Sequence, residues 1–168
     1  RIESGMGLSN MVLYPTPGLS LFCTVGNGPM RGSEFANGIL IVVSGNEVYE
    51  ISAAGAIVGG AAYGTVLQDA FQASMASNTY QTLIISGGKG YILSGGVLTI
   101  IADADFPGNL PNVRALKCGY VDGYFFVLAD NDQFYISALN DGTDWTLIDS
   151  SMIESSANKL KSMIIDHR

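Results

Sequence analysis

Short apolar runs separated by turn residues alternate along this chain, and three pairs of runs follow one pattern. The pairs are Leu40–Ser44 with Tyr49–Ser52, Thr82–Ser86 with Tyr91–Ser94, and Phe125–Ala129 with Phe134–Ser137. In each pair the small residue that ends the first run lies eight positions before the closing serine, and successive pairs are 42 and 43 residues apart. A repeat of about 40–50 residues built from short β-rich runs is typical of β-propeller blades. The pattern therefore predicts an all-β, propeller-like fold.

The repeat divides the chain into three four-stranded blades of about 42 residues and part of a fourth. The blades are expected over about 30–66, 68–102 and 112–150, with the start of the next at 158–168. Their strands are expected at 31–36, 39–44, 47–52, 56–59, 72–77, 82–86, 90–94, 97–102, 113–118, 124–129, 133–139 and 145–148. Further strands are expected at 19–25 and 158–165, with a short helical connection at 152–161. Because propellers close with about four to eight blades, we expect residues 19–168 to be a fragment of a larger propeller.

Turn residues lie between the expected strands. Pairs such as Asn37-Gly38, Gly87-Gly88 and Asp122-Gly123 are those that tight hairpins prefer. The aromatic residues that recur at one strand position, Tyr49, Tyr91 and Phe134, are expected to pack between blades.

Residues 1–18 lack this pattern and are rich in Gly, Ser and Pro. Two prolines force the segment Tyr14–Gly18 into an extended conformation. We interpret residues 1–18 as an extended arm or linker.

Composition narrows the possible functions. The 168 residues are 48% hydrophobic and 14% charged, with a net charge of −7. The eight basic residues are scattered, whereas nucleic-acid binding uses clustered Lys and Arg. We therefore expect no sequence-specific nucleic-acid binding and no membrane association. The low charge fits either a surface covered by other subunits or an all-β domain rich in small turn residues.

Oxygen-rich clusters are the candidates for chemistry. Asp103 with Asp105, Asp130 with Asp132, and Asp141 with Asp144 could hold Ca²⁺, but they lack EF-hand spacing and Asp is common in turns. The single histidine is His167, and Cys23 and Cys118 form no CxxC pair. We therefore predict no catalytic residue, cofactor or metal, and no enzymatic activity. A propeller hydrolase using Asp103 or Asp105 is a third, weaker interpretation.

Several short blocks resemble one family. They are Leu13–Phe22, Pro29–Gly32, Asp103–Gly108, Val121–Phe125, Gln133–Trp145 and Ile165–Arg168. In order and spacing they resemble the packaged-DNA stabilisation proteins of short-tailed phages, which are also called tail hub or head-completion proteins. The blocks span nearly the whole chain.

The resemblance implies a structural virion protein. Such a protein forms a homo-oligomeric ring, expected to be a hexamer, below the portal and its adaptor, closes the channel after DNA packaging, and carries the tail needle and tailspikes. It is located in the virion tail and assembled in the host cytoplasm. The alternative from the binding class is a virion propeller that recognises host glycan, with an exposed Trp145 beside Asp141 and Asp144 as its best feature.

Segments that depart from the repeat are the expected partner contacts, because loops on a rigid scaffold often carry function. The residues predicted to contact partners are Tyr14, Pro15, Pro17, Asp105, Phe106, Pro107, Asn140, Asp141 and Trp145.

Overall fold

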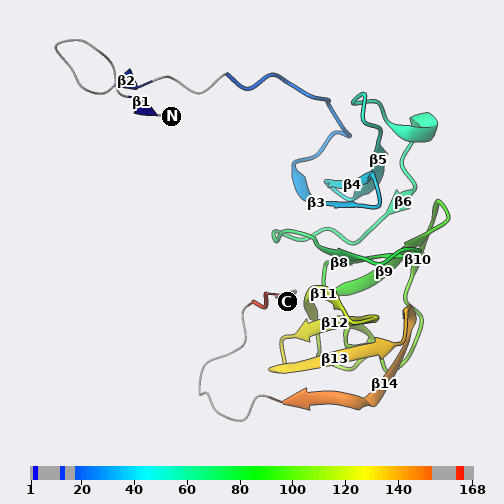
Figure 1. Cartoon of the computed structure of the whole chain (residues 1–168). Helices are drawn as coiled ribbons and strands as arrows, with labels where there is room; N and C mark the ends of the chain where they lie inside the picture. The colour runs from blue at the N-terminus through cyan, green and yellow to red at the C-terminus, as the bar shows by residue number, and fades with distance from the viewer. Residues whose placement is uncertain (1, 4–11, 14–17, 153–161, 165–168) are drawn as a thin grey trace.

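Three four-stranded antiparallel sheets follow one another along the chain and stack face to face (Figure 1). The computed structural model describes residues 2–3, 12–13, 18–152 and 162–164. Sheet 1 contains β3 (Met30–Ala36), β4 (Ile39–Ser44), β5 (Glu47–Ile51) and β6 (Gly64–Thr65). Sheet 2 contains β7 (Ser74–Ser77), β8 (Thr82–Ser86), β9 (Lys89–Ser94) and β10 (Val97–Ile100). Sheet 3 contains β11 (Ala115–Val121), β12 (Tyr124–Ala129), β13 (Gln133–Ala138) and β14 (Asp141–Met152).

The smaller elements lie outside these sheets. A two-stranded sheet pairs β1 (Ile2–Glu3) with β2 (Val12–Leu13), and two short 3₁₀ turns are η1 (Val58–Gly60) and η2 (Pro107–Asn109). Among the described residues, no helix is long and apolar enough to cross a membrane. The all-β prediction of four-stranded, blade-like sheets is confirmed.

Hairpin turns sit where the turn residues predict them. Both central residues have positive φ at Asn37-Gly38, Gly87-Gly88 and Asp122-Gly123, as the tight hairpin turn with two left-handed residues requires. The strands β4, β8 and β12 have the predicted bounds, and each is followed by a turn with left-handed backbone at Gly45, at Gly87-Gly88 or at Asp132.

The third repeat is one residue out of step with the first two. Tyr49 pairs with Val42 and Tyr91 pairs with Ile84, but the equivalent pair in sheet 3 is Tyr135 with Val127. The loop between β12 and β13 is longer, and it ends in Asp132 with a left-handed φ of 63°. Tyr135 is therefore the buried equivalent of Tyr49 and Tyr91, and the prediction of Phe134 for that position is wrong.

Three expected strands differ most from the structure, whereas others are shifted only at their ends, such as 113–118, which is observed as β11 over Ala115–Val121. Residues 56–59 form a turn with η1, since Gly55, Gly59 and Gly60 have positive φ, and the fourth strand of sheet 1 is the short β6. The fourth strand of sheet 3 runs over Asp141–Met152 instead of 145–148. Residues 19–25 are in no strand.

The expected helical connection at 152–161 and the strand at 158–165 lie almost wholly outside the described residues. Residues 162–164 belong to no strand.

Each sheet buries side chains on both faces, as successive residues of a strand point to opposite sides. One face of sheet 1 packs with the facing side of sheet 2 through Val43, Val48, Ile84 and Leu93. The other face of sheet 2 packs on sheet 3 through a larger cluster that includes Leu83, Phe106, Phe125 and Trp145. Val42, Tyr49 and Ile51 form a third cluster on the far face of sheet 1.

Candidate interaction surfaces

A buried arginine joins sheet 1 to the segment that leads into sheet 2. The Arg31 side chain is 6% exposed and lies at a β-bulge between Met30 and Gly32. Its Nη1 donates to the Gly45 carbonyl (3.0 Å) and to Ser86 Oγ (2.9 Å), and its Nη2 lies 2.7 Å from Asp69 Oδ1. A buried guanidinium needs this many partners because its desolvation is costly.

Asp69 also binds a second arginine. Arg114 Nη2, on the segment leading into sheet 3, lies 3.0 Å from Asp69 Oδ2. Asp69 thus links elements of all three sheets. The residue pattern alone gave no signal for this ion cluster, although Arg31 lies inside the family-like block Pro29–Gly32.

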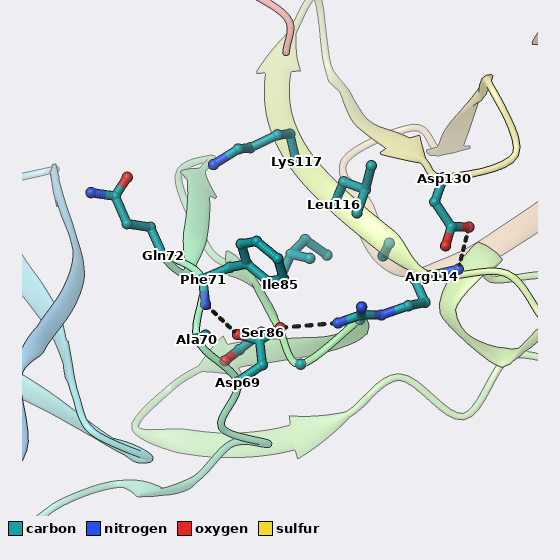
Figure 2. A pocket seen from close by; sticks show the side chains of 13 residues that line it. Asp69, Ala70, Phe71, Gln72, Ile85, Ser86, Arg114, Leu116, Lys117 and Asp130 are labelled. Atoms are coloured by element: carbon teal, nitrogen blue, oxygen red, sulfur yellow. Dashed lines mark hydrogen bonds and ion pairs between the residues drawn. The ribbon is translucent and has the colours of Figure 1, made fainter. Parts of the chain in front are cut away.

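A cavity of about 530 Å³ opens beside Asp69, between sheets 2 and 3 (Figure 2). Figure 2 shows Phe71, Ile85 and Leu116 forming its apolar wall, with Arg114 and Asp130 on one side. Phe71 is 66% exposed. The Arg114 backbone N–H donates to Asp130 Oδ1 (2.8 Å), which fixes that side of the cavity. The hollow thus combines an apolar wall with polar groups at one side.

The loop Asp103–Gly108 is held by the sheet 2–sheet 3 core instead of projecting from it. Phe106 is fully buried, and its ring meets that of Trp145 edge to face with centroids 5.1 Å apart. Pro107 is buried as well. The side chains of Phe106 and Pro107 pack in the interior, because the loop folds back over the hairpin turn that precedes β9.

Asp103 and Asp105 form a local turn that the Asp103 carboxylate stabilises. Asp103 Oδ1 accepts the backbone N–H of Asp105 (2.8 Å), and its Oδ2 accepts that of Trp145 (3.0 Å). Both carboxylate oxygens of Asp103 are therefore used to bind the backbone, which gives no support to a hydrolase at this place.

Trp145 is 3% exposed, so the expectation of an exposed tryptophan is wrong. Its indole N–H donates to the Gly142 carbonyl (2.8 Å), and its ring fills the core beside Phe106. The glycan-binding alternative loses its best feature, because a sugar needs an exposed ring to stack on.

Asn140 and Asp141 do lie at the rim. Asn140 is exposed, with a left-handed φ of 57°, and its Oδ1 accepts the Tyr120 hydroxyl (2.6 Å). Asp141 Oδ1 accepts the Thr143 hydroxyl (2.7 Å), and this bond holds the pKa of Asp141 below its usual value.

Partner contact at Asn140, Asp141 and the partly exposed Asp105 stays a prediction. Tyr14, Pro15 and Pro17 lie outside the described residues.

Other candidate groups are structural where the chain is described. Gly87-Gly88 is the hairpin turn between β8 and β9. Within the described residues, no three His, Cys, Asp or Glu side chains gather as metal ligands. Cys23 and Cys118 are free thiols. Burial raises the pKa of Cys118 to about 12, against an opposing hydrogen bond with Ser74, so its thiol is protonated and unreactive near neutral pH.

Comparisons with solved structures bear on the fold. The computationally designed Ika4 protein superposes with a TM-score of 0.61 at 4% identity, covering 89% of each chain. The WD40 domain of Neurospora crassa Pan2 gives a TM-score of 0.46 at 12% identity, over 73% of this chain and 36% of that one. PorZ of Porphyromonas gingivalis gives 0.46 at 13% identity, over 76% and 17%. A search of curated sequences finds no match.

The stacked meander sheets and the sequence repeat define the fold class, a β-propeller type of protein. A family model described as bacteriophage P22 Gp10, β-propeller, matches residues 2–163. The chain belongs to this family, which makes it a phage structural protein of the virion.

Proposed function

We propose that this protein is the tail hub, or head-completion factor, of a short-tailed phage. It closes the portal channel after DNA packaging and connects the head to the tail needle and tailspikes. It acts as a homo-oligomeric ring, taken as a hexamer, below the portal and its adaptor. It is assembled in the host cytoplasm, is located in the virion tail, and carries out no enzymatic step.

The observation that carries this proposal is the family match over residues 2–163. Large apolar side chains such as Phe35, Phe71 and Tyr80 are 66–76% exposed, and the subunit interfaces of the proposed ring would cover side chains of this kind.

The charge of the chain suits a position beside DNA. With a net charge of −7, it repels the duplex, which would let DNA slide past. Making the channel-facing surface basic should slow DNA ejection, and unchanged ejection would count against this part of the proposal.

A nonsense mutation in the gene of the parent phage tests the role. We expect heads that package DNA, then lose it, and assemble no tail. A matched nonsense mutation in a tailspike gene is the control, because it should leave filled, stable heads. Filled, tailed particles that fail only to adsorb would contradict the hub role and favour glycan binding.

A further inference from the structure

Turns of all three sheets meet at one rim of the molecule, at the opposite end of β3 from Arg31. The side chain of Asn37, in the β3–β4 turn, donates to the Asn78 carbonyl (2.9 Å) in the β7–β8 connection. The side chain of Asn78 donates in turn to the Asn140 carbonyl (3.3 Å) in the β13–β14 turn. These two bonds join sheet 1 to sheet 2 and sheet 2 to sheet 3. The resulting surface, which we call the asparagine rim, is therefore a single platform.

The two ends of the sheets differ in charge. In the part of the chain that the structure describes, the basic residues all lie at or near the end opposite the asparagine rim, and they are Arg31, Lys89, Arg114 and Lys117. Acidic residues lie at the asparagine rim, and they include Glu50, Asp122, Asp141 and Asp144. This rim therefore attracts a positively charged partner and repels a negatively charged one.

A cavity of about 170 Å³ opens at the asparagine rim between sheets 1 and 2. Glu50 is the charged residue of its lining, and Tyr63 and Tyr80 are also part of that lining. The Tyr63 hydroxyl donates to Glu50 Oε2. This bond raises the pKa of Tyr63 to about 12, so the hydroxyl keeps its proton at neutral pH. The bond uses one oxygen of Glu50, whereas a carboxylate can accept hydrogen bonds at both.

A carboxylate that shares a cavity with two tyrosines suits a cationic group. A guanidinium donates two parallel N–H groups to a carboxylate, and aromatic faces attract it as well. Ile39 and Leu93 line the same cavity and suit the methylene stem of an arginine side chain. The chemistry of the lining and the charge of the rim thus select the same kind of partner.

We propose that the asparagine rim is a docking surface for a basic segment of a partner protein, with an arginine side chain of that segment bound to Glu50 in the cavity. The ring of Tyr80, which is 76% exposed, packs against the arginine or an apolar neighbour of it. This inference does not depend on the proposed function.

Fluorescence anisotropy with labelled peptides tests the docking on the protein as its gene encodes it. The probe is the blocked peptide Leu-Arg-Leu-Arg-Leu, and the matched neutral peptide carries glutamine in place of each arginine. We expect saturable binding of the arginine peptide, and binding of the glutamine peptide that is weaker by about tenfold or more, because it lacks the charge-assisted hydrogen bonds. No binding, or equal binding of the two peptides, would overturn the proposal.

Glu50→Gln should weaken binding of the arginine peptide by about tenfold. The new amide oxygen can still accept the Tyr63 hydroxyl, so the fold keeps this contact. Glu47→Gln is the matched control, since Glu47 Oε2 accepts the Tyr49 hydroxyl (2.7 Å) near the other end of the same strand. Both variants change the net charge equally, so equal weakening would show only a general attraction and would overturn the site.

Tyr80→Ala tests the aromatic wall without disturbing the fold. The bonds that hold this residue use its backbone N–H and carbonyl, and the substitution keeps both groups. We expect binding of the arginine peptide to weaken by about threefold to fivefold. Unchanged binding would overturn the role of this ring. Self-association of the protein that Glu50→Gln abolishes, without peptide binding, would identify a second copy as the occupant and overturn the proposal.

Discussion

The junction between sheets 1 and 2 and the junction between sheets 2 and 3 join repeats of one design in different ways. In the first, the buried Arg31 binds Ser86, the Gly45 carbonyl and Asp69. In the second, Phe106 and Trp145 pack edge to face in an apolar cluster. Sheets 1 and 3 each carry a β-bulge near the start of their first strand, β3 or β11. The bulged residue is Arg31 in β3 and Leu116 in β11.

This difference shows that the repeat sets the spacing of the sheets, whereas a few residues determine which contacts join neighbouring sheets. At the first junction Arg31 reaches across to the segment that leads into sheet 2. At the second the cavity of about 530 Å³ remains beside Leu116. The hydroxyl groups of Ser44 and Ser86 donate hydrogen bonds to the segments that precede sheets 1 and 2. The equivalent residue of the third repeat is Ala129, which has no hydroxyl group. Both junctions thus contain an apolar cluster, to which the first adds the buried Arg31 with its polar contacts and the second adds the Phe106–Trp145 aromatic pair.

The largest effect is expected at the aromatic junction. Phe106→Ala should lower the free energy of unfolding by about 3–5 kcal/mol, because it empties a fully buried site against Trp145. Denaturant unfolding followed by Trp145 fluorescence measures it. Phe71→Ala, at an exposed phenylalanine near the same junction, is the control and should cost far less. A loss below about 1 kcal/mol in Phe106→Ala would mean that this contact does not hold the junction.

Removal of the arginine at the other junction should have the next largest effect. Arg31→Ala should lower the free energy of unfolding by about 2–4 kcal/mol, because Ser86 and the carbonyl groups of Gly45 and Phe71 lose their donor. Asp69 keeps its ion pair with Arg114. The same denaturation measurement applies.

Arg114→Ala is the matched control for Arg31→Ala, because it removes the other arginine of Asp69. Its side chain is 47% exposed, so the change should cost about 0–1 kcal/mol and diminish with salt. Equal losses in the two variants would show that burial does not distinguish these two ion pairs.

A methyl group added at Gly90 should strain the aromatic junction. A Cβ there would lie 2.4 Å from Cζ of Phe106 and 2.8 Å from Cδ1 of Ile101, and both side chains are buried. Gly90→Ala should therefore cost about 1–3 kcal/mol through overpacking. The double variant Gly90→Ala with Phe106→Leu should recover part of the loss. Additive losses would indicate that the two sites do not meet.

The smallest effect concerns pH at the polar junction. Burial raises the pKa of Glu34, on β3, despite an opposing hydrogen bond with Ser77 of sheet 2. The ionised carboxylate is therefore less favourable in the folded than in the unfolded protein, and the associated stability is lost as pH rises through the folded pKa.

Glu34→Gln removes this titration. Relative to the wild type, the variant should gain stability between pH 4 and pH 7, as measured by thermal unfolding at several pH values. Asp141→Asn should show the opposite trend, because the pKa of Asp141 is lowered and its contribution is present at neutral pH. A pH-independent difference for Glu34→Gln would contradict the assignment.

The sequence by itself determined the repeat, the hairpins and hence the fold class. Turn residues such as Asn37-Gly38 and Asp122-Gly123 act locally, since their backbone conformations follow from residue type. Short apolar runs that end at turn residues likewise predicted the bounds of β4, β8 and β12. The family-like blocks gave the family that the model match over residues 2–163 confirms.

Tertiary structure alone decided what depends on partners distant in the sequence. The sequence predicts Leu19–Val25 as a strand, but strand formation needs a paired edge, and none lies beside it in the described structure. The burial of Trp145 and Phe106 required a residue of β14 and a loop residue 39 positions before it to come into contact, and no local pattern predicts such a contact. The enclosure of Arg31 arose for the same reason. Local sequence sets the backbone conformation, whereas burial is a property of the neighbours that folding brings into contact.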